Sequence, residues 1–207
     1  MKLNNFPQKC RSLCLMASLC FLQSAASAAP TELAGVQYAD TAELRGSKLV
    51  LNGAGIRYKA VFKVYTAGLY LGKKASTPQE VFSQGGSKRL SLTMLRDIDA
   101  SELGKLFIHG VEDNIPRSES IRIVPSMMRM SQVFSDYKNL KTGDTVTIDW
   151  LPGAGTVISI KGKVYGEPFK EPEFFNGLLS IWLGKSPADW KLKEALLGQK
   201  AQATNLN

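Results

Sequence analysis

Three side chains near the first third of the chain have the chemistry to hold an anion. Arg57 stands just before an apolar run that ends at Leu71, and Tyr65 and Tyr70 lie within that run. A guanidinium stays charged in proteins and forks onto a carboxylate or a phenolate, while tyrosine hydroxyls offer hydrogen-bond donors. We therefore predict an anion anchor at Arg57 with the two tyrosines beside it. The alternative is a solvated arginine at the end of a strand.

Other chemistries have less support. His109 is the only histidine, and the three cysteines lie at positions 10, 14 and 20. A zinc site uses three or four protein ligands, so no metal site is expected, and a haem held by His109 is the remaining cofactor alternative. Gly53 and Gly55 do not begin a G-x-G-x-x-G motif because residue 58 is tyrosine. Both glycines are interpreted as positions where the backbone needs conformational freedom, at a β-bulge or at the tight start of a strand.

An apolar helical stripe rich in methionine has two interpretations. Met127 and Met130 belong to it, and Phe107 belongs to a stripe on the preceding helix. Methionine adapts to irregular surroundings and lines pockets, but an apolar stripe on a helix usually faces the core. Under the first interpretation, Met127, Met130 and Phe107 line the apolar part of a ligand site.

The elements that would position these residues follow from periodicity. Strands are predicted over 35–38, 42–44, 47–51, 60–71, 90–95, 145–150 and 156–160. The stretch 52–59 is interpreted as a turn whose glycines free the backbone. Both sides of 60–71 are mostly apolar, so this strand is expected to be central and covered on both faces.

Helices are predicted in the middle and at the end of the chain. Asp99 or Ser101 is expected to cap a helix that ends before Pro116, and Pro125-Ser126 is expected to begin the next. Two more helices are predicted over 171–183 and 188–197. This order predicts an α+β fold, with a large, mostly antiparallel sheet and helices packed over one face. Such an arrangement leaves a slot for an apolar ligand.

The N-terminus has the pattern of a signal peptide. Lys2, Lys9 and Arg11 precede an apolar run over 13–22, and Ala26-Ser27-Ala28 offers a cleavage site. The run is shorter than the roughly 20 residues of a spanning helix, so no stable membrane span is expected. We predict cleavage near Ala28, a single domain over 29–207, and a periplasmic or secreted location. The lack of later cysteines favours a bacterial periplasm over a eukaryotic extracellular space.

The charge of the chain excludes one class of partner. The formal net charge is +8, but the basic residues are scattered and form no stripe with aromatic residues. Nucleic-acid-binding proteins usually show such a stripe or a known module, so no nucleic-acid partner is expected. The expected partner is a small amphipathic or aromatic ligand, and the oligomeric state is left open.

Three segments resemble the chalcone isomerase-like family. Residues 52–57 (NGAGIR) are similar to its G-A-G-x-R segment, and 62–71 (FKVYTAGLYL) resembles its F-x-x-Y/T-A-x-G-x-Y-L strand. Residues 174–184 (FFNGLLSIWLG) resemble its late pocket helix. The resemblance implies a large antiparallel sheet with helices over one face and a ligand cleft between them. The family includes plant enzymes that cyclise chalcones, fatty-acid-binding proteins and members without catalysis.

The resemblance also implies roles for single residues. The arginine that anchors the anionic oxygen of the substrate falls on Arg57, and the strand threonine falls on Tyr65, or on Thr66 with a shift of one residue. A polar residue of the late helix falls near Asn176. The family's helix tyrosine and asparagine fall near Leu103 and Gly110, which lack those donors.

Two hypotheses follow. The first is an exported, non-catalytic protein that binds a small amphipathic anion, such as a fatty acid or a phenolic, through Arg57 and Tyr65. The second is an isomerase or intramolecular lyase acting on a chalcone-like or other enone substrate, with Thr66 and Asn176 completing the polar set. The missing helix donors favour the first, because one lost donor of this type costs about 3 kcal/mol of barrier.

Overall fold

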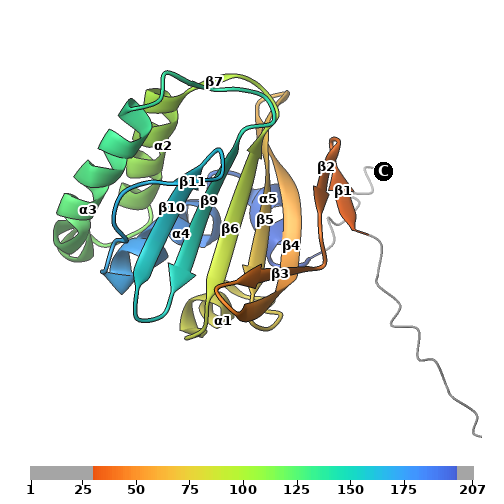
Figure 1. Cartoon of the computed structure of the whole chain (residues 1–207), viewed down its shortest axis with the longest axis horizontal. Helices are drawn as coiled ribbons and strands as arrows, with labels where there is room; N and C mark the ends of the chain where they lie inside the picture. The colour runs from red at the N-terminus through yellow and green to blue at the C-terminus, as the bar shows by residue number, and fades with distance from the viewer. Residues whose placement is uncertain (1–29, 200–207) are drawn as a thin grey trace, which may run out of the picture.

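Seven antiparallel strands form the main sheet of the computed structural model, which describes residues 30–199. Their order across the sheet is β11-β10-β9-β6-β5-β4-β3 (Figure 1). The bounds are β3 (Thr41–Leu44), β4 (Ser47–Lys59), β5 (Phe62–Leu71), β6 (Lys88–Met94), β9 (Thr145–Leu151), β10 (Gly155–Ile160) and β11 (Lys163–Val164). Two small pairs complete the strands: β1 (Thr31–Leu33) with β2 (Val36–Tyr38), and β7 (Ile98–Asp99) with β8 (Asn139–Leu140).

The long helices lie over one face of this sheet (Figure 1). The helix α4 (Pro172–Leu183) packs on β10, while α2 (Ala100–Glu112) and α3 (Arg117–Ser135) contact α4. The helix α5 (Trp190–Leu196) lies on β4 and β5, and the short α1 (Pro78–Ser83) connects β5 to β6. The predicted α+β class, with an antiparallel sheet and helices over one face, is confirmed.

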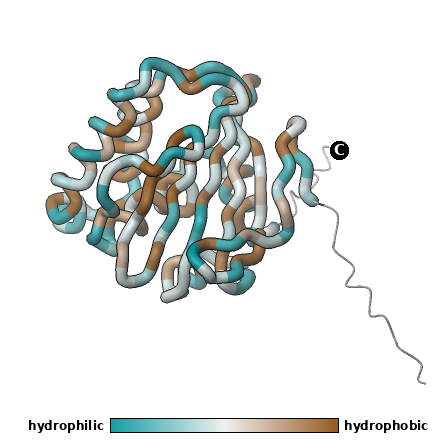
Figure 2. The backbone as a smooth tube through the Cα atoms, in the orientation of Figure 1, coloured by the Kyte–Doolittle hydropathy of each residue, from teal (hydrophilic) through white to brown (hydrophobic). Residues whose placement is uncertain are grey.

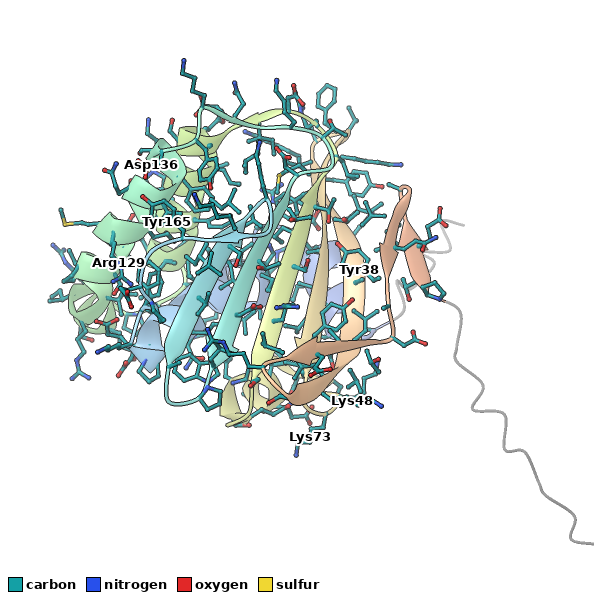
Figure 3. The ribbon with its side chains drawn as sticks, in the orientation of Figure 1. Tyr38, Lys48, Lys73, Arg129, Asp136 and Tyr165 are labelled. Atoms are coloured by element: carbon teal, nitrogen blue, oxygen red, sulfur yellow. The ribbon has the colours of Figure 1, made fainter. Side chains whose placement is uncertain are left out.

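The central strand β5 is covered on both faces, as its composition predicted. Tyr65 and Leu69 point to the helices and join the main core, whereas Thr66 and Tyr70 point to the opposite face. On that second face Tyr38 lies against the sheet and donates to Thr66 (Figure 3). Figure 2 shows apolar and polar segments alternating along α2 and α3, as expected of helices with one buried face.

Two local predictions are wrong. Residues 52–59 are not a turn, because β4 continues to Lys59 and the chain turns at Ala60 and Val61 instead. The helix α3 begins at Arg117, and Pro125 lies inside it. One buried stripe, formed by Ile123, Met127 and Met130, runs past Pro125, so packing outweighs the lost hydrogen bond.

The structure also contains α1, a helix that the periodicity did not predict. Its N-terminus carries a capping box, in which the Thr77 side chain accepts from the Glu80 backbone and the Glu80 side chain accepts from the Thr77 backbone.

Of the helices within residues 30–199, none has the length and apolar composition needed to cross a membrane. The predicted signal peptide, residues 1–28, lies outside the described residues.

Candidate functional site

A cleft of about 410 Å³ opens between the sheet and α2. One wall is formed by the β4–β5 end of the sheet, and the others by α2, by the segment 96–99 and by the loop between α4 and α5. This volume lies within the range of roughly 300–1,000 Å³ that small-molecule sites occupy. The cleft is the candidate functional site.

Strand pairing places an arginine and a tyrosine side by side in this cleft. Arg57 of β4 stands opposite Tyr65 of β5 in the antiparallel register, and directly opposed residues point to the same face of a sheet. Both residues line the cleft. The register shifts immediately afterwards, between Arg57 and Tyr58.

The phenol of Tyr65 is a neutral hydrogen-bond donor whose oxygen is fixed by a hydrogen bond from the core side. It is buried, and its hydroxyl accepts a hydrogen bond of 2.9 Å from Nε1 of Trp182 on α4. Burial raises the pKa of Tyr65 to about 12, and the charge of Arg57 opposes that rise. Because the indole nitrogen can only donate, the phenol keeps its own proton for another acceptor. A ligand anion between Arg57 and Tyr65 would meet a fixed charge and a hydroxyl donor.

The deeper walls are apolar. Phe107 lies edge-on to both Trp182 and Phe134, with ring centroids 5.3 and 5.4 Å apart. This aromatic cluster fixes the Phe107 ring at the inner wall. The other apolar residues that line the cleft are Val64, Ile98, Leu103, Leu106 and Ile181. The site therefore joins a polar pair to a surface suited to a hydrocarbon or aromatic group.

Specific hydrogen bonds fix the walls formed by α2 and by the α4–α5 loop. Asp99 caps α2 by accepting from the backbone N–H of Glu102 at 2.9 Å, which confirms one of the two predicted caps. At the other end of α2, the Asn114 amide donates to the carbonyl of Ser186 and accepts from its N–H, at 2.9 and 2.7 Å. That pair of bonds fixes the α4–α5 loop against the cleft.

The charges of the cleft are divided between its walls. The sheet wall carries only cations, Arg57 and Lys59. The segment 96–99 carries Arg96 together with Asp97 and Asp99, and α2 with its C-cap carries Glu102 and Asp113. An anion is therefore favoured on the sheet wall. His109 also lines the cleft, mostly exposed and 3.4 Å from Glu112. Within residues 30–199, no group of three or more His, Cys, Asp or Glu is arranged to hold a metal ion.

Comparison with known proteins agrees with this architecture. The family model described as chalcone isomerase-like matches residues 30–198. The chain belongs to the chalcone isomerase-like family. The resemblance inferred from the segments around Arg57, Tyr65 and Asn176 is thereby confirmed. A comparison with curated proteins gives no significant match.

A solved structure shows the same fold. The chain is similar to a fatty-acid-binding protein of Arabidopsis thaliana, with a TM-score of 0.61 and 17 % sequence identity. The similarity covers 79 % of this chain and 92 % of the plant protein. At this level of identity the likeness establishes the chalcone isomerase-like fold alone.

Three of the predicted site residues meet in the cleft of this family member, namely Arg57, Tyr65 and Phe107. The other five lie elsewhere. Thr66 and Tyr70 are on the opposite face of the sheet, and Met127 and Met130 are packed in the main core. Asn176 is exposed on α4, outside the cleft lining.

Three residues of the site were not predicted from the sequence. Trp182 orients Tyr65, Asn114 holds the α4–α5 loop, and Arg96 adds a cation from the segment 96–99. Trp182 lies in the segment 174–184, where the chain resembles the chalcone isomerase-like family. The pairing of Asn114 with Ser186 carries no local signal, because the two residues are 72 positions apart.

Proposed function

We propose that this protein binds a small amphipathic anion, such as a fatty acid or a phenolic, in the cleft between the sheet and α2, without catalysing a reaction. The observation that carries the proposal is the pairing of Arg57 and Tyr65 on the sheet wall of a cleft whose inner walls are apolar. Arg57 supplies the charge, Tyr65 supplies the donor, and the aromatic wall at Phe107 receives the apolar part of the ligand.

The composition of α2 supports binding over catalysis. The family's catalytic donors fall near Leu103 and Gly110, and both of these residues line the cleft. Neither side chain can donate a hydrogen bond. Thr66 and Asn176, the other members of the proposed catalytic set, do not line it. We therefore expect no loss of the long-wavelength absorbance of a chalcone on incubation with the protein. Turnover would support the isomerase alternative instead.

The test of binding is a comparison of charged and uncharged ligands. Arg57→Ala is expected to weaken binding of a long-chain fatty acid to delipidated protein by more than about tenfold, the effect of roughly 1.4 kcal/mol. Affinity for the matching fatty alcohol should change much less, because the alcohol carries no charge for Arg57 to meet. Isothermal titration of both ligands measures this difference.

A matched control is Arg122→Ala, an exposed arginine on α3 outside the cleft lining, which should leave both affinities unchanged. Affinity should also rise with chain length until the apolar walls are covered, by roughly 0.8 kcal/mol per buried methylene. Equal fatty-acid affinity in Arg57→Ala and the unmodified protein would contradict the proposal.

We further propose that the protein is exported and acts in the periplasm. The support is the sequence pattern of the first 28 residues, a basic start, a short apolar run and Ala26-Ser27-Ala28. The intact mass of the protein recovered from the periplasmic fraction should correspond to a chain that begins near residue 29. Recovery of the uncleaved chain from the cytoplasm would contradict this.

A further inference from the structure

The end of the molecule that carries the cleft also carries a protruding apolar tip. The β4–β5 hairpin turns at Ala60 and Val61, and Val61 is 82 % exposed. Phe62 is 59 % exposed and Tyr58 is 40 % exposed. Large apolar side chains at this exposure lose contact with water when the tip meets an apolar medium.

The same hairpin is basic. Residues 57–63 contain Arg57, Lys59 and Lys63 and no acid. The guanidinium of Arg96 lies over the Phe62 ring, 5.4 Å from its centroid, and so brings a further cation to the tip.

The acidic residues next to the tip already have partners. Asp97 accepts from Lys141 at 2.8 Å and from the backbone N–H of Thr142. Asp189 caps α5 and accepts from the backbone N–H of Tyr58 at 2.9 Å. These contacts offset part of the local negative charge, which leaves the cations of the hairpin to act on a partner.

The turn itself departs from the pattern of its neighbours. The other two-residue turns place a glycine second, as Ala34-Gly35, Arg45-Gly46 and Lys161-Gly162. The β4–β5 turn has Ala60 at φ 55° followed by Val61. Ala34, Arg45 and Lys161 have the same left-handed φ at the first turn position, so the difference lies at the second position, where Val61 does not adopt a positive φ. Hairpin turns favour glycine and asparagine over valine. Val61 is therefore exposed at a turn position whose conformation does not require a valine.

We propose that this hairpin tip, residues 58–63, docks on an anionic lipid bilayer. Val61 and Phe62 enter the headgroup region, and Lys59, Lys63 and Arg96 pair with lipid phosphates. Exposed apolar side chains ringed by cations are the combination that binds anionic membrane surfaces. A protein partner is less favoured, because a stable protein interface needs roughly 800 Å² on each side and the convex tip of one hairpin offers little of that.

Docking would bring the cleft to the lipid surface. Lys59 of the tip and Arg96, which packs on Phe62, also line the cleft, so the mouth and the tip face the same end of the molecule. An amphipathic ligand would then pass between bilayer and cleft without crossing bulk water. The docking step does not depend on the proposed ligand, because the tip residues Val61 and Phe62 lie outside the cleft lining.

The test is vesicle sedimentation with phosphatidylcholine vesicles, with and without phosphatidylglycerol. We expect binding to the anionic vesicles, and a loss of at least about tenfold in the partition coefficient for Val61→Ser/Phe62→Ser. The same loss is expected for Lys59→Gln/Lys63→Gln, since one basic residue near an anionic surface contributes about fivefold. Every variant is prepared in the same form as the unmodified protein, so any contribution of residues 1–28 is common to all.

Matched controls lie at other parts of the surface. Met128→Ser/Val164→Ser changes two side chains that are 70 % and 54 % exposed on α3 and β11. Lys48→Gln/Lys73→Gln changes two lysines at the opposite end of the sheet (Figure 3). Both controls should bind vesicles within about twofold of the unmodified protein, the scatter allowed for surface changes.

Four outcomes would overturn the proposal. The first three are no vesicle binding, equal binding to neutral and anionic vesicles, and tip variants that bind like the controls. A fourth is a tip variant that changes only the mass of the protein in solution, which would make the tip a self-association surface. Fatty-acid affinity of Val61→Ser/Phe62→Ser, measured without vesicles, should stay unchanged. A failure of docking is thereby distinguished from a failure of the cleft proposal.

Discussion

At the residue scale, the site depends on a tyrosine that is buried and yet able to donate. The Trp182 indole satisfies the oxygen of Tyr65 from the core side, and burial keeps the phenol protonated because it raises the pKa to about 12. Arg57 provides the permanent charge that a neutral phenol lacks. Arg57 and Tyr65 therefore offer a ligand a positive charge and a hydrogen-bond donor together. The buried Trp182 N–H keeps its acceptor, the Tyr65 oxygen.

This arrangement predicts a dependence of stability on alkaline pH. Below pH 10 the phenol of Tyr65 is protonated in both the folded and the unfolded chain. Between pH 10 and pH 12 the unfolded chain loses the proton first, so the free energy of unfolding falls, by roughly 2 kcal/mol for a pKa raised to about 12. Urea unfolding at a series of pH values measures the fall.

In Tyr65→Phe the part of the fall due to this residue should be absent. At neutral pH that variant should be less stable by about 1–2 kcal/mol, since the Trp182 indole loses its acceptor. Tyr58→Phe, at an exposed tyrosine, is the control and should keep the fall. An unchanged pH profile in Tyr65→Phe would show that the buried phenol does not cause it.

At the element scale, β4 holds α5 at both ends. The side chain of Asn52 donates to the carbonyl of Leu196 at 2.7 Å, and the backbone of Tyr58 donates to Asp189, the N-cap of α5. Between these points Gly53 and Gly55 let the helix approach the strand. A Cβ on Gly53 would lie 2.0 Å from the Ala195 carbonyl oxygen.

Gly53→Ala is therefore expected to lower the free energy of unfolding by about 3 kcal/mol, the upper part of the range for overpacked cores. The added methyl group meets the backbone of α5, which cannot move aside without losing the Asn52 contact. Urea unfolding measures the change.

The control for this prediction is Gly86→Ala, where a Cβ would meet nothing within 4 Å. It should alter stability by less than about 0.5 kcal/mol, as surface substitutions do. Similar stability in the two variants would mean that α5 does not need the close approach at Gly53.

At the scale of the whole molecule, the sheet separates two environments. The helix face contains the main core and the cleft. The opposite face has its own small cluster around Tyr38, Leu49 and Tyr70, with Arg89 and Asp149 in a two-point ion pair at 2.7 Å. Ligand binding and the packing of the second face should therefore be separable by mutation.

Thr66→Val tests this separation. Thr66 is fully buried and accepts from the Tyr38 hydroxyl at 2.8 Å, so its loss should cost about 1 kcal/mol of stability. Fatty-acid affinity should stay within about twofold, because Thr66 faces away from the cleft. A large loss of affinity, measured by titration of a long-chain fatty acid, would show that the two faces are coupled through β5.

The sequence by itself determined the α+β class, the antiparallel sheet, a cap of α2 at Asp99 or Ser101, and Arg57 as a candidate anion anchor. These follow from local patterns, since alternation, helical spacing and capping chemistry act within a few residues. Residues 65 and 70 differ by an odd number, so a regular strand must send their side chains to opposite faces. Tyr70 was therefore separable from Tyr65 by counting alone.

Only the tertiary structure decided which residues share the cleft. The pairing of β4 with β5 sets Arg57 opposite Tyr65, and a shift of one residue would have brought Thr66 there instead. Whether the Met127–Met130 stripe faces a ligand or the core depends on how α3 packs on α4, and it faces the core. Such contacts join segments far apart in the chain, and no local pattern specifies which long-range packing is formed.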